Sequence, residues 1–127
     1  MLLFVYGTLL SGQEQHSLLE DARFIGKART RGTLYDLGEF PALCTHEIRG
    51  NVYGELYEID ENTFAFLDEY EGYSPHNEKD SLYLRVEITC YTAQGSAVKA
   101  QAYIMPEHQL KRFLNIEIIP SGRWEQR

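Results

Sequence analysis

The sequence is poor in cysteine, which argues against a fold held together by disulfides. Its 127 residues contain two cysteines, Cys44 and Cys90, which lie far apart and have no CxxC or CxxH context. Two such thiols in a chain of this length are typical of reduced core residues in a cytoplasmic protein. We therefore predict a fold that depends on its hydrophobic core.

The sequence also lacks a cluster of metal-ligating side chains. Its four histidines, His16, His46, His76 and His108, form no HxxxH or HExxH motif. Because metal sites in proteins usually show such ligand spacing, we expect neither a metal nor another cofactor. For His16 we expect a structural hydrogen bond rather than a catalytic role.

Positive charge is scarce, with 12 basic against 19 acidic residues and a formal net charge of -7. A nucleic-acid surface needs a basic stripe, so no nucleic-acid partner is expected. No apolar run has the length that spans a bilayer, and the N-terminal stretch MLLFVYGTLLSG has no basic leader. We predict a cytoplasmic protein without a membrane partner, folded as one domain over residues 1–127.

What the sequence does contain is a series of strand-like segments. Residues 2–6 form a short apolar run that ends at Gly7, and residues 50–59 alternate between two faces. Residues 82–91 and 97–105 also alternate and are separated by a short polar stretch, which predicts a hairpin.

The remaining segments have weaker patterns. Residues 22–37 are extended but interrupted by Gly26 and Gly32, which predicts bulges or bends in a curved sheet. Residues 38–41 are predicted to form a turn, since a proline disfavours a helical conformation in the residue before it. The tail after Pro106 has little periodicity and is expected to wrap the surface.

Two segments are predicted to be helical. Asp60 can cap a helix that begins at Glu61, and Gly72 is a suitable C-terminal stop. Residues 13–19 have the pattern of one or two helical turns. The sequence therefore predicts an α+β fold: a small, mixed, barrel-like curved sheet with one main helix and a short N-terminal helix.

The main helix ends in LDEYEGY, residues 67–73, which contains three acids. With Phe64 at the centre of the buried face, Asp68 and Glu71 lie on or beside that face, whereas Glu69 points to solvent. A partly buried carboxylate at the C-terminal end of a helix has a raised pKa, which suits proton transfer near neutrality. A glutamate bound to a backbone amide or an arginine explains the same pattern, and Asp68 is expected to be structural.

A second candidate element follows the first strand. The motif Tyr6-Gly7-Thr8-Leu9 places a glycine at a strand end, where backbone N–H groups can approach an anionic ligand closely. Strand-glycine turns are common, so this motif alone defines no site.

Taken together, these motifs resemble the gamma-glutamylcyclotransferase-like superfamily, specifically its small bacterial-type branch. The matching segments occur in the expected order and cover most of the chain. They are FVYGTLLSGQEQH (4–16), LYDLGEFPAL (34–43), GNVYGELYEI (50–59), LDEYEGY (67–73), YLR (83–85), AYIM (102–105) and SGRW (121–124).

The resemblance implies a compact mixed barrel with a cavity, and the release of 5-oxoproline from small gamma-glutamyl compounds. It implies that Glu71 is the catalytic acid and base, and that the loop after the first strand supplies backbone donors to the substrate. The residues that it assigns to substrate binding are Tyr6, Gly7, Thr8, Leu9, Tyr83 and Tyr103. Leu10 stands where family members often carry a basic residue, which leaves the accepted substrate tail open.

In the implied reaction, the alpha-amine of the substrate attacks its own gamma-carbonyl, so neither an enzyme nucleophile nor a metal is required. Arg85 could anchor a carboxylate of the substrate, or it could pair with Glu87 or with a neighbouring strand, and the sequence does not decide between these roles. The alternative function is a non-catalytic module that binds or senses a small molecule. The acid at Glu71 argues against it, because a pocket for an anion gains nothing from a buried carboxylate.

Overall fold

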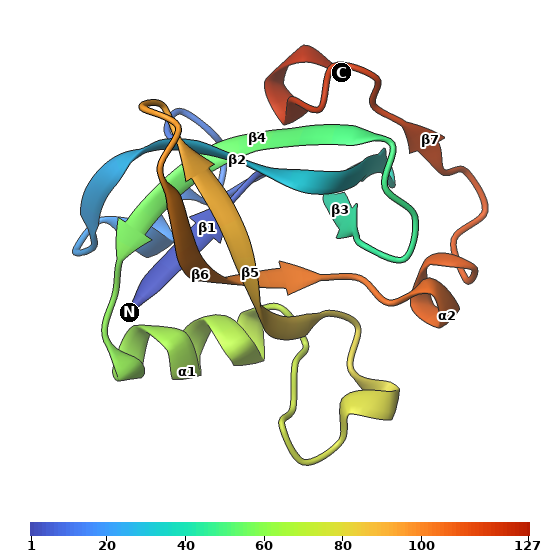
Figure 1. Ribbon diagram of the computed structural model, residues 1–127. Helices are drawn as coiled ribbons and strands as arrows, with labels where there is room; N and C mark the ends of the chain where they lie inside the picture. The colour runs from blue at the N-terminus through green and yellow to red at the C-terminus, as the bar shows by residue number, and fades with distance from the viewer.

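The computed structural model describes residues 1–127 and consists of a strongly curved sheet with short helices at its edges (Figure 1). The strands are β1 (Leu2–Val5), β2 (Arg23–Asp36), β3 (Pro41–Cys44), β4 (Gly50–Glu58), β5 (Leu84–Thr92), β6 (Ala97–Ile104) and β7 (Glu117–Ile118). The α-helices are α1 (Glu61–Tyr70) and α2 (Glu107–Leu110), and the 3₁₀ turns are η1 (His16–Leu19), η2 (Glu78–Asp80) and η3 (Trp124–Gln126).

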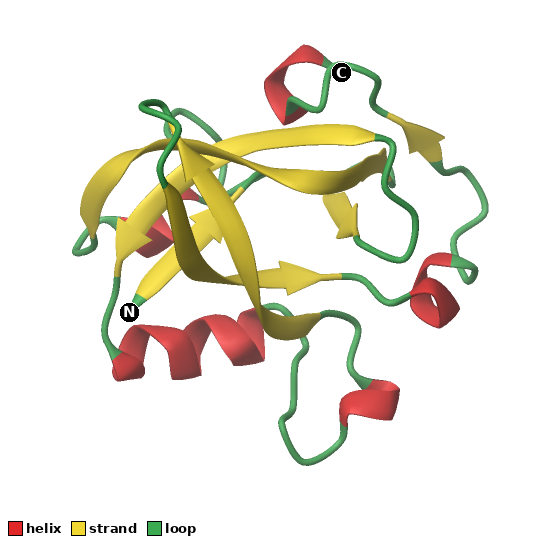
Figure 2. Ribbon diagram, viewed as in Figure 1, coloured by secondary structure: helices red, strands yellow, loops and turns green.

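Five of the strands close into a barrel. They follow the order β2-β4-β1-β6-β5, and β5 pairs back with β2 through Ala28 opposite Thr92. β1 and β6 run parallel, whereas the other neighbours in the barrel are antiparallel. Figure 2 shows that the strands form the body of the molecule and that α1 lies across one end of the barrel. The predicted α+β fold with a mixed, barrel-like sheet is therefore confirmed.

The two glycines of β2 have different roles. The register between β2 and β4 shifts between Phe24 and Gly26, so the predicted bulge is present there. At Gly32 no bulge forms, because this residue stays in register opposite Gly50, and directly after it β2 changes its partner from β4 to β3. A Cβ atom on Gly32 would lie 2.8 Å from the Leu43 side chain, so a glycine at this position lets β3 approach β2 closely.

The predicted turn at residues 38–41 is one residue too long. Residues 38–40 do form a bend, but Pro41 begins β3, which pairs with the end of β2. A proline is tolerated at the first position of a strand, where its missing N–H costs little. All four residues of β3 are buried, so this strand closes one side of the interior.

Helix α1 begins and ends as its sequence predicts. The Asp60 side chain accepts a hydrogen bond of 2.8 Å from the Thr63 backbone N–H at the start of the helix. At the end, Gly72 has a φ of 71°, and the Tyr73 N–H donates to the Asp68 carbonyl at 2.8 Å. This Schellman-type stop ends the helix before Glu71, which leaves that residue at the junction between helix and loop.

The C-terminal tail follows the surface but is anchored at several points. The Ile119 N–H donates to the Leu34 carbonyl at 2.8 Å, and the Tyr53 N–H donates to the Gly122 carbonyl at 2.9 Å. Trp124 is only 2% exposed, so the tail also contributes a large side chain to the core.

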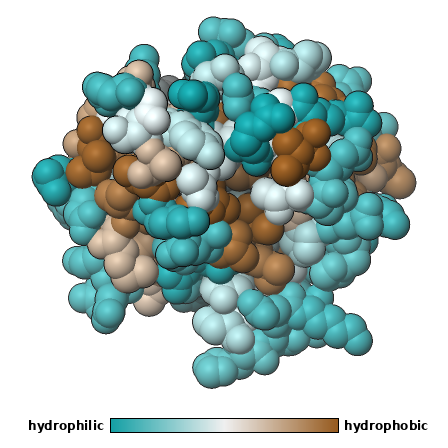
Figure 3. All heavy atoms as spheres, viewed as in Figure 1, coloured by the Kyte–Doolittle hydropathy of each residue, from teal (hydrophilic) through white to brown (hydrophobic).

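The core also contains Cys44 and Cys90, both fully buried as free thiols. In the view of Figure 3, polar side chains surround a group of apolar ones near the centre of this face. None of the helices combines the length and the apolar character needed to cross a membrane.

Candidate active site

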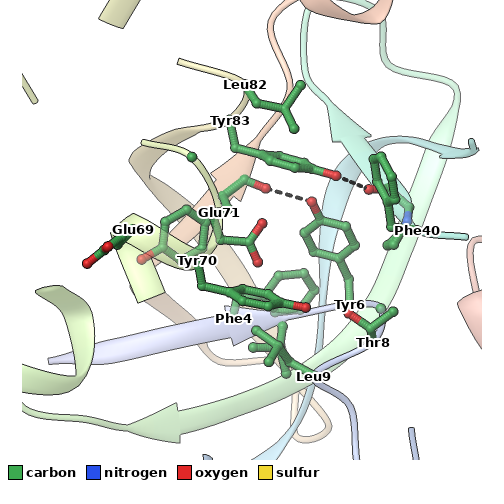
Figure 4. Close-up of a pocket in the computed structure, with 15 residues that line it drawn as sticks. Phe4, Tyr6, Thr8, Leu9, Phe40, Glu69, Tyr70, Glu71, Leu82 and Tyr83 are labelled. Carbon is green, nitrogen blue, oxygen red and sulfur yellow. Dashed lines mark hydrogen bonds between the residues drawn. The ribbon is translucent and has the colours of Figure 1, made fainter. Parts of the chain in front are cut away.

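A cavity of about 340 Å³ opens where the loop after β1, the end of α1 and the start of β3 meet (Figure 4). All seven residues that the family resemblance assigns to the site lie in its lining. They are Tyr6, Gly7, Thr8, Leu9, Glu71, Tyr83 and Tyr103. Apolar side chains form much of the remaining wall, so the polar groups of the site lie in a small and mainly apolar cavity.

The Glu71 carboxylate points into this cavity, toward the rings of Tyr6, Tyr70 and Tyr83 (Figure 4). Burial raises the pKa of Glu71 from its usual range to about 7. Glu69 lies at the rim of the cavity and is exposed, as helix periodicity predicts. The two acids therefore differ in environment although they are two residues apart.

The loop of residues 7–9 presents unpaired backbone donors. None of its three N–H groups donates a hydrogen bond within the chain. Its carbonyl groups are occupied instead, since they bond the N–H groups of Leu10 and Gln15 at 3.0 and 2.9 Å and the His16 ring at 2.9 Å. His16 thus makes the structural hydrogen bond expected for it. The loop leaves three donors free for an anionic ligand.

The conformation of this loop depends on Gly7. A Cβ atom built on Gly7 would lie 2.2 Å from Pro41 Cγ and 3.0 Å from its Cδ. Only glycine therefore allows the loop to pack against the first residue of β3. This contact joins two cavity walls that are more than thirty residues apart in sequence.

The hydroxyl groups of two buried tyrosines tie the cavity walls together. The Tyr6 hydroxyl donates to the Tyr103 carbonyl at 2.6 Å and accepts a bond of 3.3 Å from the Leu43 N–H. The Tyr83 hydroxyl donates to the Pro41 carbonyl at 2.5 Å. Burial raises the pKa of both phenols, so they stay protonated as donors. The Tyr83 oxygen can still accept a hydrogen bond from a ligand.

A partly buried group of contacts fixes the end of α1 to the β5–β6 hairpin. Asp68 accepts a 2.6 Å hydrogen bond from the Tyr103 hydroxyl and a 3.2 Å bond from Arg85 Nη2. Arg85 Nε lies 2.9 Å from Asp68 Oδ1 but without hydrogen-bond alignment, and the guanidinium sits 4.5 Å from the centre of the Phe64 ring. Asp68 is thus structural, as expected, and Arg85 pairs with it rather than with Glu87.

Tyr70 is a lining residue that the sequence analysis does not identify. It precedes Glu71 in LDEYEGY, is 46% exposed, and directs its ring into the mouth of the cavity toward Thr8 (Figure 4). An aromatic residue at an exposed helix position beside a candidate catalytic acid is the signal that could have found it. Elsewhere in the chain, no group of three or more His, Cys, Asp or Glu side chains is arranged to hold a metal ion.

The chain is similar both to a solved structure and to a family of sequences. The crystal structure of YkqA from Bacillus subtilis superposes with a TM-score of 0.73 at 32% identity, over 98% of this chain and 39% of that one. The sequence profile described as "Gamma-glutamyl cyclotransferase, AIG2-like" matches residues 3–126. The chain therefore belongs to this family of gamma-glutamylcyclotransferase-like proteins.

Two curated relatives extend this result. A Vibrio cholerae protein named "Putative gamma-glutamylcyclotransferase" is 36% identical over 99% of this chain and 96% of its own length. The gamma-glutamylaminecyclotransferase of Bos taurus is 36% identical over 67% of this chain and 56% of its own length.

Proposed function

We propose that the chain is a gamma-glutamyl cyclotransferase, which releases 5-oxoproline from a gamma-glutamyl amino acid or amine. The observation that carries this proposal is that one cavity is lined both by Glu71 and by the loop of residues 7–9, whose three backbone N–H groups have no partner in the chain. Family membership and the names of the relatives support the same reaction. The cavity volume of about 340 Å³ is within the range of small-molecule sites.

In the proposed mechanism, Glu71 is the general base and then the general acid. Its carboxylate takes a proton from the alpha-ammonium of the substrate, and the freed amine attacks the gamma-carbonyl carbon to close a five-membered ring. The bond between this carbon and the departing nitrogen then breaks as Glu71 returns the proton to that nitrogen. Over one turnover the alpha-nitrogen loses two protons and the departing nitrogen gains two, so Glu71 regains its starting charge.

The loop of residues 7–9 positions the substrate in this proposal. Its N–H groups bind the alpha-carboxylate and stabilise the negative charge that develops on the carbonyl oxygen. The Tyr83 hydroxyl donates to the protein, and its oxygen accepts from the substrate. Tyr6 and Tyr103 contribute their rings, because the Tyr6 hydroxyl both donates and accepts within the protein and the Tyr103 hydroxyl is directed to Asp68. Holding the amine against its own carbonyl turns the attack into an intramolecular step, which is a large part of the rate enhancement.

The proposed reaction predicts release of 5-oxoproline without a metal. The purified chain is incubated with several gamma-glutamyl amino acids and amines, and 5-oxoproline is measured by chromatography. We expect release that EDTA does not reduce, because proton transfer at Glu71 and the loop amides suffice. Loss of activity in EDTA that a divalent ion restores would contradict this. Tight binding without 5-oxoproline would instead favour the non-catalytic binding module.

The raised pKa of Glu71 predicts how activity depends on pH. Because the carboxylate form is the base, kcat/KM is expected to rise with pH and to level off above about 7. The free energy of unfolding changes in the opposite direction, because the raised pKa means that protonated Glu71 favours the folded state. This contribution is fully present below the pKa of an unfolded glutamate and is lost as pH rises through about 7. The Tm values of the wild type and Glu71→Gln should converge at low pH, because glutamine resembles a protonated glutamate. A kcat/KM profile that is flat between pH 5 and 8, roughly the range of a shifted carboxylate, would contradict the assignment.

Single-domain organisation over residues 1–127, a cytoplasmic location, and the absence of nucleic-acid and membrane partners stay predictions.

A further inference from the structure

Behind one wall of the candidate active site lies a pair of opposite charges that the proposed mechanism does not use. Asp68 and Arg85 do not line the cavity, but the Tyr103 side chain, which does, donates a hydrogen bond to Asp68 at 2.6 Å. Arg85 bonds the same carboxylate, with Nη2 3.2 Å from Oδ2. The start of β5 thus lies beside the end of α1 (Figure 1), and a cation sits one side chain away from the cavity.

The charge of Arg85 is compensated by Asp68 alone. Its side chain is 21% exposed and that of Asp68 is 13% exposed, and Arg85 takes part in no other ion pair. Arg85 Nε is a buried donor without a hydrogen-bond partner, and the guanidinium lies 4.5 Å from the centre of the Phe64 ring. A partly buried guanidinium that loses its carboxylate carries a large energetic cost, which favours its pairing with another negative charge.

Glu71 is the carboxylate that the end of the helix places next to Asp68. It follows Asp68 by three residues, and side chains with this spacing are neighbours on one face of a helix. The Tyr103 phenol lies close to all three charges. Burial and the contact with Asp68 raise its pKa, Arg85 lowers it, and Glu71 raises it again. A guanidinium released by Asp68 would therefore have Glu71 within its reach.

The other groups that face Glu71 carry no positive charge. The cavity lining contains no lysine, arginine or histidine, and Glu69 at its rim is exposed. The thiol of Cys44 on β3 is neutral, since burial raises its pKa to about 12. Four phenols have a pKa that the charge of Glu71 raises, so they too are neutral near neutral pH: Tyr6, Tyr70, Tyr83 and Tyr103. The raised pKa of Glu71 itself is caused by burial, with no cation that lowers it.

We propose that Asp68 is a positioning residue for the reaction, which holds the Arg85 guanidinium behind the cavity wall and prevents that cation from pairing with Glu71. The Glu71 carboxylate then stays directed into the cavity and has no cation to stabilise it. It therefore remains a base strong enough to take a proton from an ammonium group. This inference rests on the proposed cyclotransferase function and adds a residue that sets the proton affinity of its acid and base.

Two single variants should shift the pH dependence of kcat/KM in opposite directions. Asp68→Asn keeps the acceptor for Tyr103 but frees Arg85, so the midpoint of the acidic limb should fall by about 1 pH unit. The plateau value of kcat should fall about threefold to tenfold, because Glu71 becomes a weaker base. Arg85→Met keeps an unbranched side chain over the Phe64 ring but leaves the negative charge of Asp68 beside Glu71, so the midpoint should rise.

The double variant Asp68→Asn with Arg85→Met separates charge from anchoring. It removes both charges, so the midpoint should return to near the wild-type value although the ion pair between α1 and β5 is still missing. If Asp68 only anchors the helix, the double variant is at least as impaired as Asp68→Asn and its midpoint does not depend on Arg85. Glu87→Gln is the matched control, since it removes one negative charge from an exposed position on β5 and should leave the midpoint unchanged.

The protonation of Glu71 can also be measured without turnover. NMR titration of the side-chain carboxyl carbons gives the pKa of Glu71 in each protein, with its signal identified by its absence from Glu71→Gln. We expect the lowest pKa in Asp68→Asn, the highest in Arg85→Met, and similar values in the wild type and the double variant. If no gamma-glutamyl compound yields 5-oxoproline, the proposed function fails, and this titration still decides the inference.

Three results are decisive. A midpoint and an NMR titration that stay in place in both single variants overturn the inference and leave Asp68 as an anchor of α1. A double variant that keeps the low midpoint of Asp68→Asn overturns it too, because the cation responsible is then not Arg85. If Asp68→Asn does not fold, an upward shift in Arg85→Met that the double variant abolishes upholds the inference, and the absence of that shift overturns it.

Discussion

Glu71→Gln is expected to lower kcat by about 10²–10⁴-fold, the usual contribution of a positioned proton-transfer group. Glutamine keeps the shape of the side chain and can still form hydrogen bonds, but it cannot accept and return a proton. Substrate affinity should change much less, because the loop amides and Tyr83 remain in place. Folding should survive as well, since the substitution removes a partly buried carboxylate from the C-terminal end of α1.

The matched control for this variant is Glu69→Gln. Glu69 lies two residues earlier and at the same cavity rim, but its side chain is exposed. The control removes the same charge and should leave kcat nearly unchanged. Steady-state kinetics and a calorimetric Kd on each variant separate chemistry from binding. A Glu71→Gln protein with near-normal kcat on a confirmed substrate would exclude Glu71 as the acid and base.

The orientation of Glu71 could be predicted because it depends on local rules. A cap at Asp60 and a stop at Gly72 define the helix, and a period of 3.6 residues then separates Glu71 from Glu69. The strands could be predicted equally well where the alternation of apolar and polar residues is clear, as in β4 and the β5–β6 hairpin. These features are encoded within ten or so neighbouring residues, so no knowledge of the tertiary structure was needed.

The features that the sequence did not reveal depend on contacts between distant segments. β3 is only four residues long and fully buried, so its sequence shows no alternation. Its first residue is a proline, a residue type that is more typical of a turn. The place of Tyr70 beside Glu71 is a hint in the sequence, but its part in the cavity wall depends on the loops that carry Thr8 and Phe40. How these distant residues combine into one cavity wall is therefore visible only in the folded chain.

The Asp68 contact shows how the fold supports the site. Asp68 does not line the cavity, yet it bonds both Tyr103 on β6 and Arg85 on β5. These bonds hold the end of α1 against the hairpin, one turn before Glu71. The catalytic proposal thus needs two carboxylates with separate tasks, one that fixes the helix and one that moves protons.

Gly7→Ala is expected to lower kcat/KM by about 10²-fold or more, comparable to the loss of one backbone donor in an oxyanion site. The added methyl group would overlap Pro41 Cγ, so the loop must move away from β3 and take its N–H groups with it. Substrate affinity should fall along with kcat, in contrast to Glu71→Gln. The overlap should also reduce the free energy of unfolding by about 1–3 kcal/mol, which thermal unfolding can measure.

Two further variants distinguish loop displacement from a general loss of folding. Gly50→Ala adds the same methyl group where no other atom lies within 4 Å, so it should be nearly silent in both kinetics and thermal unfolding. Pro41→Ala removes Cγ and Cδ, the two atoms within 3.0 Å of the added methyl, and leaves Cβ at an acceptable 3.4 Å. Combining Pro41→Ala with Gly7→Ala should therefore restore part of the activity lost in Gly7→Ala. Near-normal kcat/KM in Gly7→Ala would show that the loop amides do not hold the substrate. If kcat/KM of the double variant is no higher than that of Gly7→Ala, Pro41 does not set the position of the loop.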